Sequence, residues 1–416
     1  STHHNKQTKR ERANSVEATN SMNTINSVKA IPRSHILIRN SLWNFTSKGW
    51  FLVLAFFTIP YIVHKLGTDA YGVLSIISVV VGYFGFLNLG LGQAVIKYVS
   101  EDYAKKDYDT IRKIIGTAMA VYFLMGFIGA TVIASLTGVL VTRVLKIPSN
   151  LINISSFVFY ISALGFLINM PLNVFGSIPK ALQRFDITNK ISICFGTLQT
   201  LLTVLLLYLG YFLKQIVIMN LLISILSISI YIMVSKKLLP QIQIKPAFSR
   251  DMFRKLFKFG GFIAISRITV QISTQINKFI IGIFLPISYL TYYVVSYGLA
   301  SKVGIIPGSI STAIFPAFSE LDSINKQDLL KELYLRATKY IVIATMPIIL
   351  LFIVFAQKFL YFWIGPEFAQ KSTLPLQIIT AGTLLSCWAF TSVSGAQGLN
   401  RPDIPAKFQV AEACLN

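Results

Sequence analysis

Long apolar stretches recur along this chain, and they constrain its fold more than any other feature. A helix needs about 20 mainly apolar residues to cross the roughly 30 Å hydrocarbon core of a bilayer. Such stretches lie at 42–64, 71–94, 114–141, 154–178, 191–212, 215–234, 259–284, 288–316, 340–363 and 374–398. Irregular backbone facing lipid would leave peptide groups unpaired, and the alternating pattern of a β-barrel is absent. The sequence therefore predicts an all-α polytopic membrane protein with about ten transmembrane helices.

The distribution of charge predicts the topology. The net charge is +22, which by itself would also suit a nucleic-acid-binding protein. If the N-terminus is cytoplasmic, 28 of the 38 Lys and Arg residues fall on the cytoplasmic side, 6 on the other side and 4 inside spans. This asymmetry is the positive-inside pattern of a membrane protein. We therefore expect a multi-pass protein of the plasma (inner) membrane with a cytoplasmic N-terminus and no nucleic-acid partner.

The polar tail and the few sulfur-bearing or imidazole side chains exclude several other classes. Residues 1–34 are poor in hydrophobic residues, which indicates a disordered cytoplasmic tail. Cys194, Cys387 and Cys414 are isolated, so they form no disulfide framework and no metal-ligand pattern. The 4 histidines fit no zinc motif either. We expect no cofactor and no metal centre.

The chain repeats itself at an offset of 219 residues. In this register "SEDYAKKDYDTIRK" (100–113) aligns with "SELDSINKQDLLKE" (319–332), so that Ser100 meets Ser319 and Glu101 meets Glu320. An even number of helices in each repeat keeps both copies in the same orientation, related by an axis along the membrane normal. The sequence thus predicts two six-helix bundles and twelve helices in total.

The repeat also predicts the boundaries of the parts. We expect an N-terminal bundle at 35–234 and a second bundle at 259–416 that is truncated, because only four of its six helices fit before the last residue. Between them, residues 235–258 form the longest cytoplasmic connection. Its Leu and Phe residues alternate with basic residues, which favours an amphipathic helix on anionic headgroups over a solvated linker.

Four cations lie inside the expected spans, namely Lys48, Arg267, Lys278 and Lys302. None of the 16 Asp and Glu residues lies in a span. A charge at the bilayer centre costs at least about 2.5–3.5 kcal/mol unless something offsets it. An anionic substrate in a water-filled cavity would do so, and we therefore expect these cations to bind one.

The stretch "SRITVQISTQINK" (266–278) places several polar side chains on one helix face. Arg267, Gln271, Thr274 and Lys278 are spaced by four, three and four residues, which align at 100° per residue. This face is expected to look onto a cavity or onto the other bundle. Lys48 stands exactly one repeat before Arg267, so the equivalent helix of each repeat carries a cation at the equivalent position.

Alternative interpretations exist for each of these residues. Lys48 and Lys278 lie near the ends of their spans, where a long side chain can reach the interface instead of a cavity. Arg267 and Lys302 lie deeper, which favours a functional role. Asn44, and Asn88 in "LNLGLGQ", either line the same cavity or form ordinary hydrogen bonds between helices.

Several motifs resemble those of a known family. "FLNLGLGQAVIKYVSE" (86–101), "GSIPKALQRFDITNKIS" (176–192), the stretch 274–321 and "ATMPIILLFIVFAQKFLYFWIGPEF" (344–368) together resemble the polysaccharide-biosynthesis and O-antigen flippases of the multidrug/oligosaccharidyl-lipid/polysaccharide exporter superfamily. The resemblance implies a transporter of twelve or fourteen helices that is not an enzyme. Its substrate would be an undecaprenyl-diphosphate-linked oligosaccharide, moved from the cytoplasmic to the outer leaflet by alternating access.

The same resemblance suggests a site and partners. Related flippases have a cationic central cavity for the diphosphate, which agrees with the cations found here. A polysaccharide polymerase and chain-length machinery are implied partners, beside anionic membrane lipids. Family members commonly carry an acidic residue where Asn277 stands in this chain. Coupling to a proton gradient, a sodium gradient or the membrane potential is therefore left open.

Three other functions were weighed. A multidrug and toxin extrusion antiporter would need intramembrane carboxylates, and the expected spans contain none. A membrane glycosyltransferase or polymerase would need a sizeable external loop, and the external loops are short. An assembly scaffold without transport would not explain the cations inside the spans.

Overall fold

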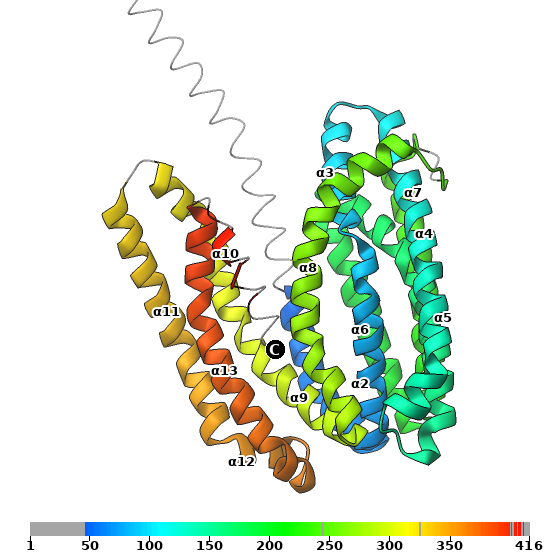
Figure 1. The fold of residues 1–416 in the computed structure, drawn as a ribbon, viewed down its shortest axis with the longest axis vertical. Helices are drawn as coiled ribbons and strands as arrows, with labels where there is room; N and C mark the ends of the chain where they lie inside the picture. The colour runs from blue at the N-terminus through cyan, green and yellow to red at the C-terminus, as the bar shows by residue number, and fades with distance from the viewer. Residues whose placement is uncertain are drawn as a thin grey trace, which may run out of the picture.

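The structure, a computed structural model, consists of long helices joined by short connections (Figure 1). It describes residues 46–242, 245–323 and 326–399, with positions 401, 403–405, 407, 408 and 411 after them. The helices are the first helix Thr46–Leu66, α2 Thr68–Tyr83, η1 Phe84–Asn88, α3 Leu91–Ala104, α4 Tyr108–Val139, η2 Leu140–Val144, η3 Ser149–Leu151, α5 Ile152–Ala181, α6 Phe185–Tyr208, α7 Leu213–Leu238, α8 Arg250–Phe284, α9 Ile287–Val303, α10 Ile305–Ser323, α11 Gln327–Val354, α12 Ala356–Trp363 and α13 Pro366–Gly398. The described residues contain no strand, so the predicted all-α polytopic fold is confirmed.

Eight helical segments of the described chain are long and apolar enough to cross a membrane. The expected spans at 259–284 and 288–316 are not among these eight. The first of them is the greater part of α8, whose hydropathy is lowered by the polar stretch 266–278. The second is divided between α9 and α10, which are separated at Gly304.

The expected single helix at 71–94 is also divided. After α2 the chain continues as the short 3₁₀ segment η1, and a turn then leads to α3. Leu89 and Gly90 form the turn with φ of 47° and 63°, in the left-handed region. Glycine adopts this region freely, whereas leucine does so at a cost. The break redirects the helix, and helical periodicity alone did not predict it.

The internal repeat is visible in the helix boundaries. Helices α2 and α9 begin at Thr68 and Ile287, and α3 and α10 end at Ala104 and Ser323. Each pair is separated by the 219 residues of the sequence repeat. The breaks fall at corresponding places too, since η1 precedes α3 in the first half as Gly304 precedes α10 in the second. The two halves are therefore built on the same plan.

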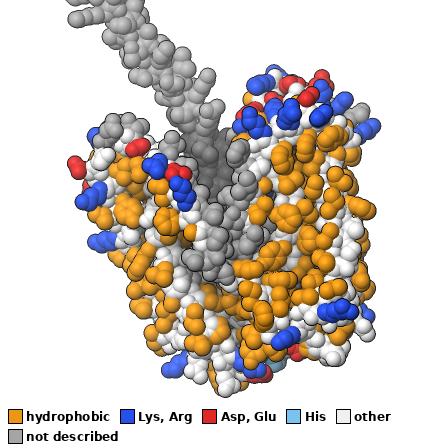
Figure 2. Space-filling view, viewed as in Figure 1, with side chains coloured by type: hydrophobic (Ala, Val, Ile, Leu, Met, Phe, Trp, Pro, Cys, Tyr) orange, Lys and Arg blue, Asp and Glu red, His pale blue; other side chains and the backbone are white. Residues whose placement is uncertain are grey.

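The helices form two groups that converge at one end of the molecule and diverge at the other (Figure 1). One group contains α2 to α8, and the other contains α10 to α13, with α9 in contact with both α2 and α13. We call the diverging end the basic end, because Lys and Arg side chains gather there on the first group (Figure 2). It carries the α3–α4 turn and the α7–α8 connection. Helix α8 packs on α2, α3 and α4 of the first half although its sequence belongs to the second repeat.

Backbone contacts join the two halves at the converging end. The amide of Lys146 donates to Gly282 O, and the amide of Ile287 donates to Lys146 O, both at 3.3 Å. The Lys146 ammonium also donates to the carbonyl of Phe284 at 2.6 Å. Thr291 Oγ1 donates to the carbonyl of Thr68 at 2.6 Å, between α9 and α2. Ile287 and Thr291 thus tie α9 to the first group at this end, whereas the two groups diverge at the basic end (Figure 1).

The connection between the halves differs from the expected amphipathic linker. Residues 245–249 are not helical and lie on α4, where the amide of Ala247 donates to Gly116 O at 3.2 Å. Thr117 Oγ1 donates to Ala247 O at 3.3 Å and accepts from the amide of Ser249 at 3.2 Å. Gly116 permits this approach, because a Cβ there would lie 2.9 Å from the carbonyl oxygen of Lys245. From Arg250 onward the segment is the start of α8 itself.

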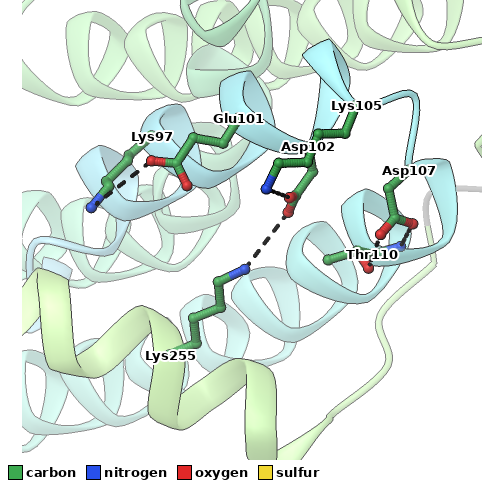
Figure 3. Close-up of polar contacts among 7 residues, drawn as sticks. All are labelled: Lys97, Glu101, Asp102, Lys105, Asp107, Thr110 and Lys255. Carbon is green, nitrogen blue, oxygen red and sulfur yellow. Dashed lines mark hydrogen bonds and ion pairs between the residues drawn. The ribbon is translucent and has the colours of Figure 1, made fainter.

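An ionic and aromatic cluster holds the start of α8 against α3 (Figure 3). Asp102 is 5% exposed and lies 3.7 Å from Lys255 of α8 and 4.0 Å from Lys105. The Lys255 ammonium also lies over the ring of Tyr98, 4.5 Å from its centroid. Lys97 bridges the same helices, with its ammonium 4.3 Å from the ring centroid of Phe259. These contacts make α8 part of the first group at the basic end.

Candidate substrate site between the two halves

A cavity lies where the first helix meets the break between α9 and α10. It measures about 460 Å³ and is lined by Lys48, Ser301, Gly304, Ile305, Gly308, Ser309 and Phe390. Lys48 is exposed, and it comes from the first half while the other residues come from the second. The hydroxyl groups of Ser301 and Ser309 donate to carbonyls of their own helices, at 3.1 and 2.8 Å. Their oxygens keep lone pairs that can accept a hydrogen bond from a ligand or water.

Lys302 lies beside this cavity in the last turn of α9. It is exposed and follows directly on Ser301, whose side chain helps to form the cavity wall. Lys48 thus lines the cavity from the first half, and Lys302 of the second half is adjacent in sequence to a residue of its wall. The positive charge accumulates at a helix break, where backbone groups are available to a ligand as well.

Lys278 occupies a different position. Its ammonium lies 4.9 Å from the ring centroid of Tyr297 on α9 and donates to Gln275 Oε1 at 3.0 Å. The side chain is half-buried and faces α9, not the lipid interface. Tyr297 and Lys302 are five residues apart on α9, which corresponds to about 7.5 Å along a helix. Lys278 is therefore placed farther towards the converging end than Lys302.

Arg267 is placed by its backbone alone. It lies on α8 and is followed by Ile268, which lines an apolar groove against α2, α4 and η1. The arrangement of its side chain falls outside the described residues, as does Asn44 altogether. Since Arg267 corresponds to Lys48 in the repeat, its role in substrate binding stays a prediction.

Gln271 has a partner in the first half. Its Nε2 donates to the carbonyl of Gly82 at 3.0 Å, near the end of α2. A Cβ on Gly82 would lie 3.1 Å from this nitrogen, so the glycine lets the amide approach closely. The amide of Gln271 thus joins α8 to α2, and Gln271 also lines the apolar groove beside Ile268, so its role in substrate binding stays a prediction. The polar face of α8 is thus used partly for packing onto the first half.

Asn88 lies elsewhere than the cavity it was expected to share with Lys48. It lines a polar pocket within the first half, with Gln93 of α3 and residues of α5 and α7. The pocket also includes Asn173, Ser177 and Lys180, three residues that we had not predicted. Lys180 was counted among the basic residues of a loop, and only the fold shows that it faces a pocket. No periodicity in the sequence identifies residues brought together from η1, α3, α5 and α7.

The described part of the chain offers no metal centre. It contains no group of three or more His, Cys, Asp or Glu side chains that could hold an ion. The cavity between the halves is lined by the ammonium group of Lys48 and the hydroxyl groups of Ser301 and Ser309.

These features define a class of protein, a polytopic α-helical membrane transporter built from two related halves. The chain belongs to the polysaccharide biosynthesis protein family, whose model matches residues 66–372. It is 23% identical over 384 residues to the "Putative O-antigen transporter" of Shigella flexneri, covering 90% of this chain and 88% of that protein. It is 24% identical over 172 residues to the "Probable low-salt glycan biosynthesis flippase Agl15" of Haloferax volcanii, covering 41% and 36%.

A solved structure shows the same fold. The chain matches an inward-facing conformation of a multidrug resistance MATE family transporter of the MOP superfamily with a TM-score of 0.71. The match covers 87% of this chain and 84% of that chain at 12% identity. At this identity the likeness shows the fold and leaves the substrate open. The protein is thus a transporter by family and a MATE-like helical bundle by fold.

Proposed function

We propose that this protein moves a polyprenyl-diphosphate-linked oligosaccharide from the cytoplasmic to the outer leaflet of the plasma membrane. The cavity that joins Lys48 to the α9–α10 break, beside Lys302, carries this proposal. An ammonium group within the membrane needs a compensating anion, and a diphosphate supplies two or more negative charges. The family membership and the similarity to a "Putative O-antigen transporter" support a lipid-linked glycan as the bearer of that diphosphate.

In this proposal the diphosphate lies between the two halves. Lys48 approaches it from the first helix, and Lys302 approaches it from the end of α9. Arg267 is the third cation, and its planar guanidinium can make paired hydrogen bonds to phosphate oxygens. The hydroxyl groups of Ser301 and Ser309 are placed to complete the shell of polar groups.

The divergence of the two groups at the basic end supports a route of entry (Figure 1). In the orientation predicted by the positive-inside rule, that end is cytoplasmic, and the substrate is assembled on that side. At the opposite end, Ile287 and Thr291 of α9 form hydrogen bonds with Lys146 and Thr68 of the first group. Transport then requires these contacts to break while the basic end closes, which is alternating access between two related halves.

The membrane potential can favour this step. A charge that moves across the membrane changes energy by about 2.3 kcal/mol per 100 mV. Since the inside of the membrane is negative, outward movement of a diphosphate with two net negative charges is favoured by twice this energy, if the charges of the protein stay in place. Coupling to a proton or sodium gradient is the alternative, and Asn277 stands where the family resemblance implies an acidic residue.

Transport in proteoliposomes tests the proposed function. Fluorescently labelled undecaprenyl-diphosphate oligosaccharide is placed in both leaflets, and an impermeant reductant reports the fraction that crosses. The proposal predicts that the protein accelerates crossing well above empty liposomes. Export of a cationic dye without any movement of the lipid would instead support the multidrug and toxin extrusion alternative.

We further propose contacts with anionic lipids at the basic end and with a polysaccharide polymerase and chain-length machinery.

A further inference from the structure

The polar pocket within the first half is not explained by a diphosphate site between the halves. It measures about 280 Å³ and lies among η1, α3, α5 and α7. Its lining includes Asn88, Gly90, Gln93, Asn173, Gly176 and Ser177. Most of its lining residues are polar or are glycines, although the pocket lies among membrane-spanning helices.

Two amide groups in this pocket are available for a ligand. The side chains of Asn88 and Gln93 make no hydrogen bond to any residue that the structure describes, and Asn88 is half-buried. By contrast, Asn173 Nδ2 donates to Met170 O at 3.2 Å, and Ser177 Oγ donates to Asn173 O at 2.6 Å. Both side chains act as donors in these two bonds, so the side-chain oxygens of Asn173 and Ser177 can still accept a hydrogen bond. The pocket therefore offers both donors and acceptors.

Glycines give the pocket its space. Gly90 turns the chain between η1 and α3 with a φ of 63°, so that the wall at this point is bare backbone. Gly176 lies on α5, and a Cβ added there would meet nothing within 4 Å. A larger side chain at Gly176 would therefore project into open space. Polar groups that line an empty space among membrane helices lack hydrogen-bond partners, which is unfavourable unless water or a polar ligand fills the space.

The pocket is open towards α3, where Gln93 is exposed. One helical turn further along, Lys97 lies over the ring of Phe259 on α8. Tyr231 of α7 adds an aromatic ring to the wall.

We infer that this pocket binds one sugar ring of the lipid-linked glycan. This inference rests on the proposed function and adds a site for the glycan to the site for the diphosphate. Sugar hydroxyls donate and accept hydrogen bonds, as do the amides of Asn88 and Gln93. Ligand pockets for larger molecules usually exceed about 300 Å³, so a space of this size suits a single ring. Binding a sugar here would hold the glycan in the first half while the diphosphate contacts cations from both halves.

Filling the pocket tests this inference without disturbing its neighbours. We choose Gly176→Leu because the added side chain enters open space, and Gly138→Leu as the matched control. Gly138 is an exposed glycine within α4, and a Cβ there also meets nothing within 4 Å. A second variant, Asn88→Leu combined with Gln93→Leu, removes the free amides. Binding is measured in nanodiscs with two lipids, namely undecaprenyl diphosphate with its oligosaccharide and the same lipid without sugar.

The wild-type protein should bind the glycosylated lipid about tenfold more tightly than the sugarless lipid, since two or three hydrogen bonds of ordinary strength have this effect. Gly176→Leu and the double amide variant should lose this difference, whereas Gly138→Leu should keep it. If Gly176→Leu binds both lipids as the wild type does, the sugar site is refuted while the proposed function stands. Equal weakening of both lipids would also refute it. If the wild type binds neither lipid, the proposed function itself fails.

Discussion

Lys255 of α8 pairs with the buried carboxylate of Asp102 on α3, with 3.7 Å between Nζ and Oδ2 (Figure 3). This pair links a helix of the second repeat to a helix of the first. Together with Lys105 it gives Asp102 two cationic neighbours in a place that is almost closed to solvent. The start of α8 is therefore expected to move with the first half when the two halves rock against each other.

Removing the cation of this pair should destabilise the protein. Lys255→Met leaves the Asp102 carboxylate, whose side chain is 8% exposed, with only the more distant Lys105, and removing one partner of a buried ion pair costs up to about 3–5 kcal/mol. Asp102→Leu should cost less, because Lys255 is 35% exposed and can turn towards water. Thermal unfolding in detergent of both variants and of the double variant measures the coupling. Strict additivity of the two changes would contradict the proposed link.

Adjacent glycines on α8 give a matched pair for its packing on the break of the first half. A Cβ on Gly260 would lie 2.8 Å from the carbonyl oxygen of Leu89, whereas one on Gly261 would meet nothing closer than 3.7 Å. Gly260→Ala should therefore destabilise the protein by about 1–3 kcal/mol through overpacking. Gly261→Ala should be neutral or stabilising by up to about 1 kcal/mol, because alanine is the better helix former. Melting temperatures of the two variants decide whether α8 packs this closely.

The N-cap of α4 should make stability depend on acid pH. Asp107 accepts from Thr110 N at 3.0 Å and from Thr110 Oγ1 at 2.7 Å, and these bonds hold the pKa of the carboxyl below its usual value. A depressed folded pKa stabilises the protein above the unfolded value of about 3.9 and ceases to do so as the pH falls through the folded value. Asp107→Asn should thus melt below the wild type at neutral pH. The gap should close in acid, and a gap independent of pH would contradict this origin.

The converging end offers a way to shift the conformational balance. A Cβ on Gly72 of α2 would lie within contact distance of the Ile287 backbone of α9, too close to be accommodated without movement. Gly72→Val should therefore hold the two halves apart at this end and disfavour the state seen here. A cysteine at Ser309 in the central cavity, in a variant whose native cysteines are replaced, reports access. Labelling from the converging side should rise with Gly72→Val, and an unchanged pattern would contradict the closure described here.

The sequence predicted the general architecture because it follows from hydropathy and from the repeat. Helices α2 and α9 start where the offset of 219 residues requires, at Thr68 and Ile287. The break at Leu89 and Gly90 could not be predicted, since one pair of left-handed residues hardly alters an apolar periodicity. It decides nonetheless where α3 and its side chains point.

The candidate site was predictable in part. Lys48 and Lys302 stood out because a cation inside a span is costly; Lys48 lines the central cavity, and Lys302 follows directly on Ser301 of its wall. Gln271 shares their polar character, but its amide donates to the carbonyl of Gly82 on α2, because an amide can bind a backbone carbonyl as readily as it can bind a ligand. Lys180 gave no signal, as a lysine near the end of a span resembles an ordinary topological charge.

The central claim is that cations from both halves hold the diphosphate of the substrate. The direct test is the rate at which labelled undecaprenyl-diphosphate oligosaccharide crosses proteoliposomes containing the wild type, Lys48→Glu, Lys302→Glu or the exposed control Lys236→Glu. Reversing one charge near a phosphate changes its energy by at least about 1.4 kcal/mol at close range, which is tenfold in rate. We predict a tenfold or greater loss for Lys48→Glu and Lys302→Glu, and an unchanged rate for Lys236→Glu. Equal rates in all four folded proteins would contradict the claim.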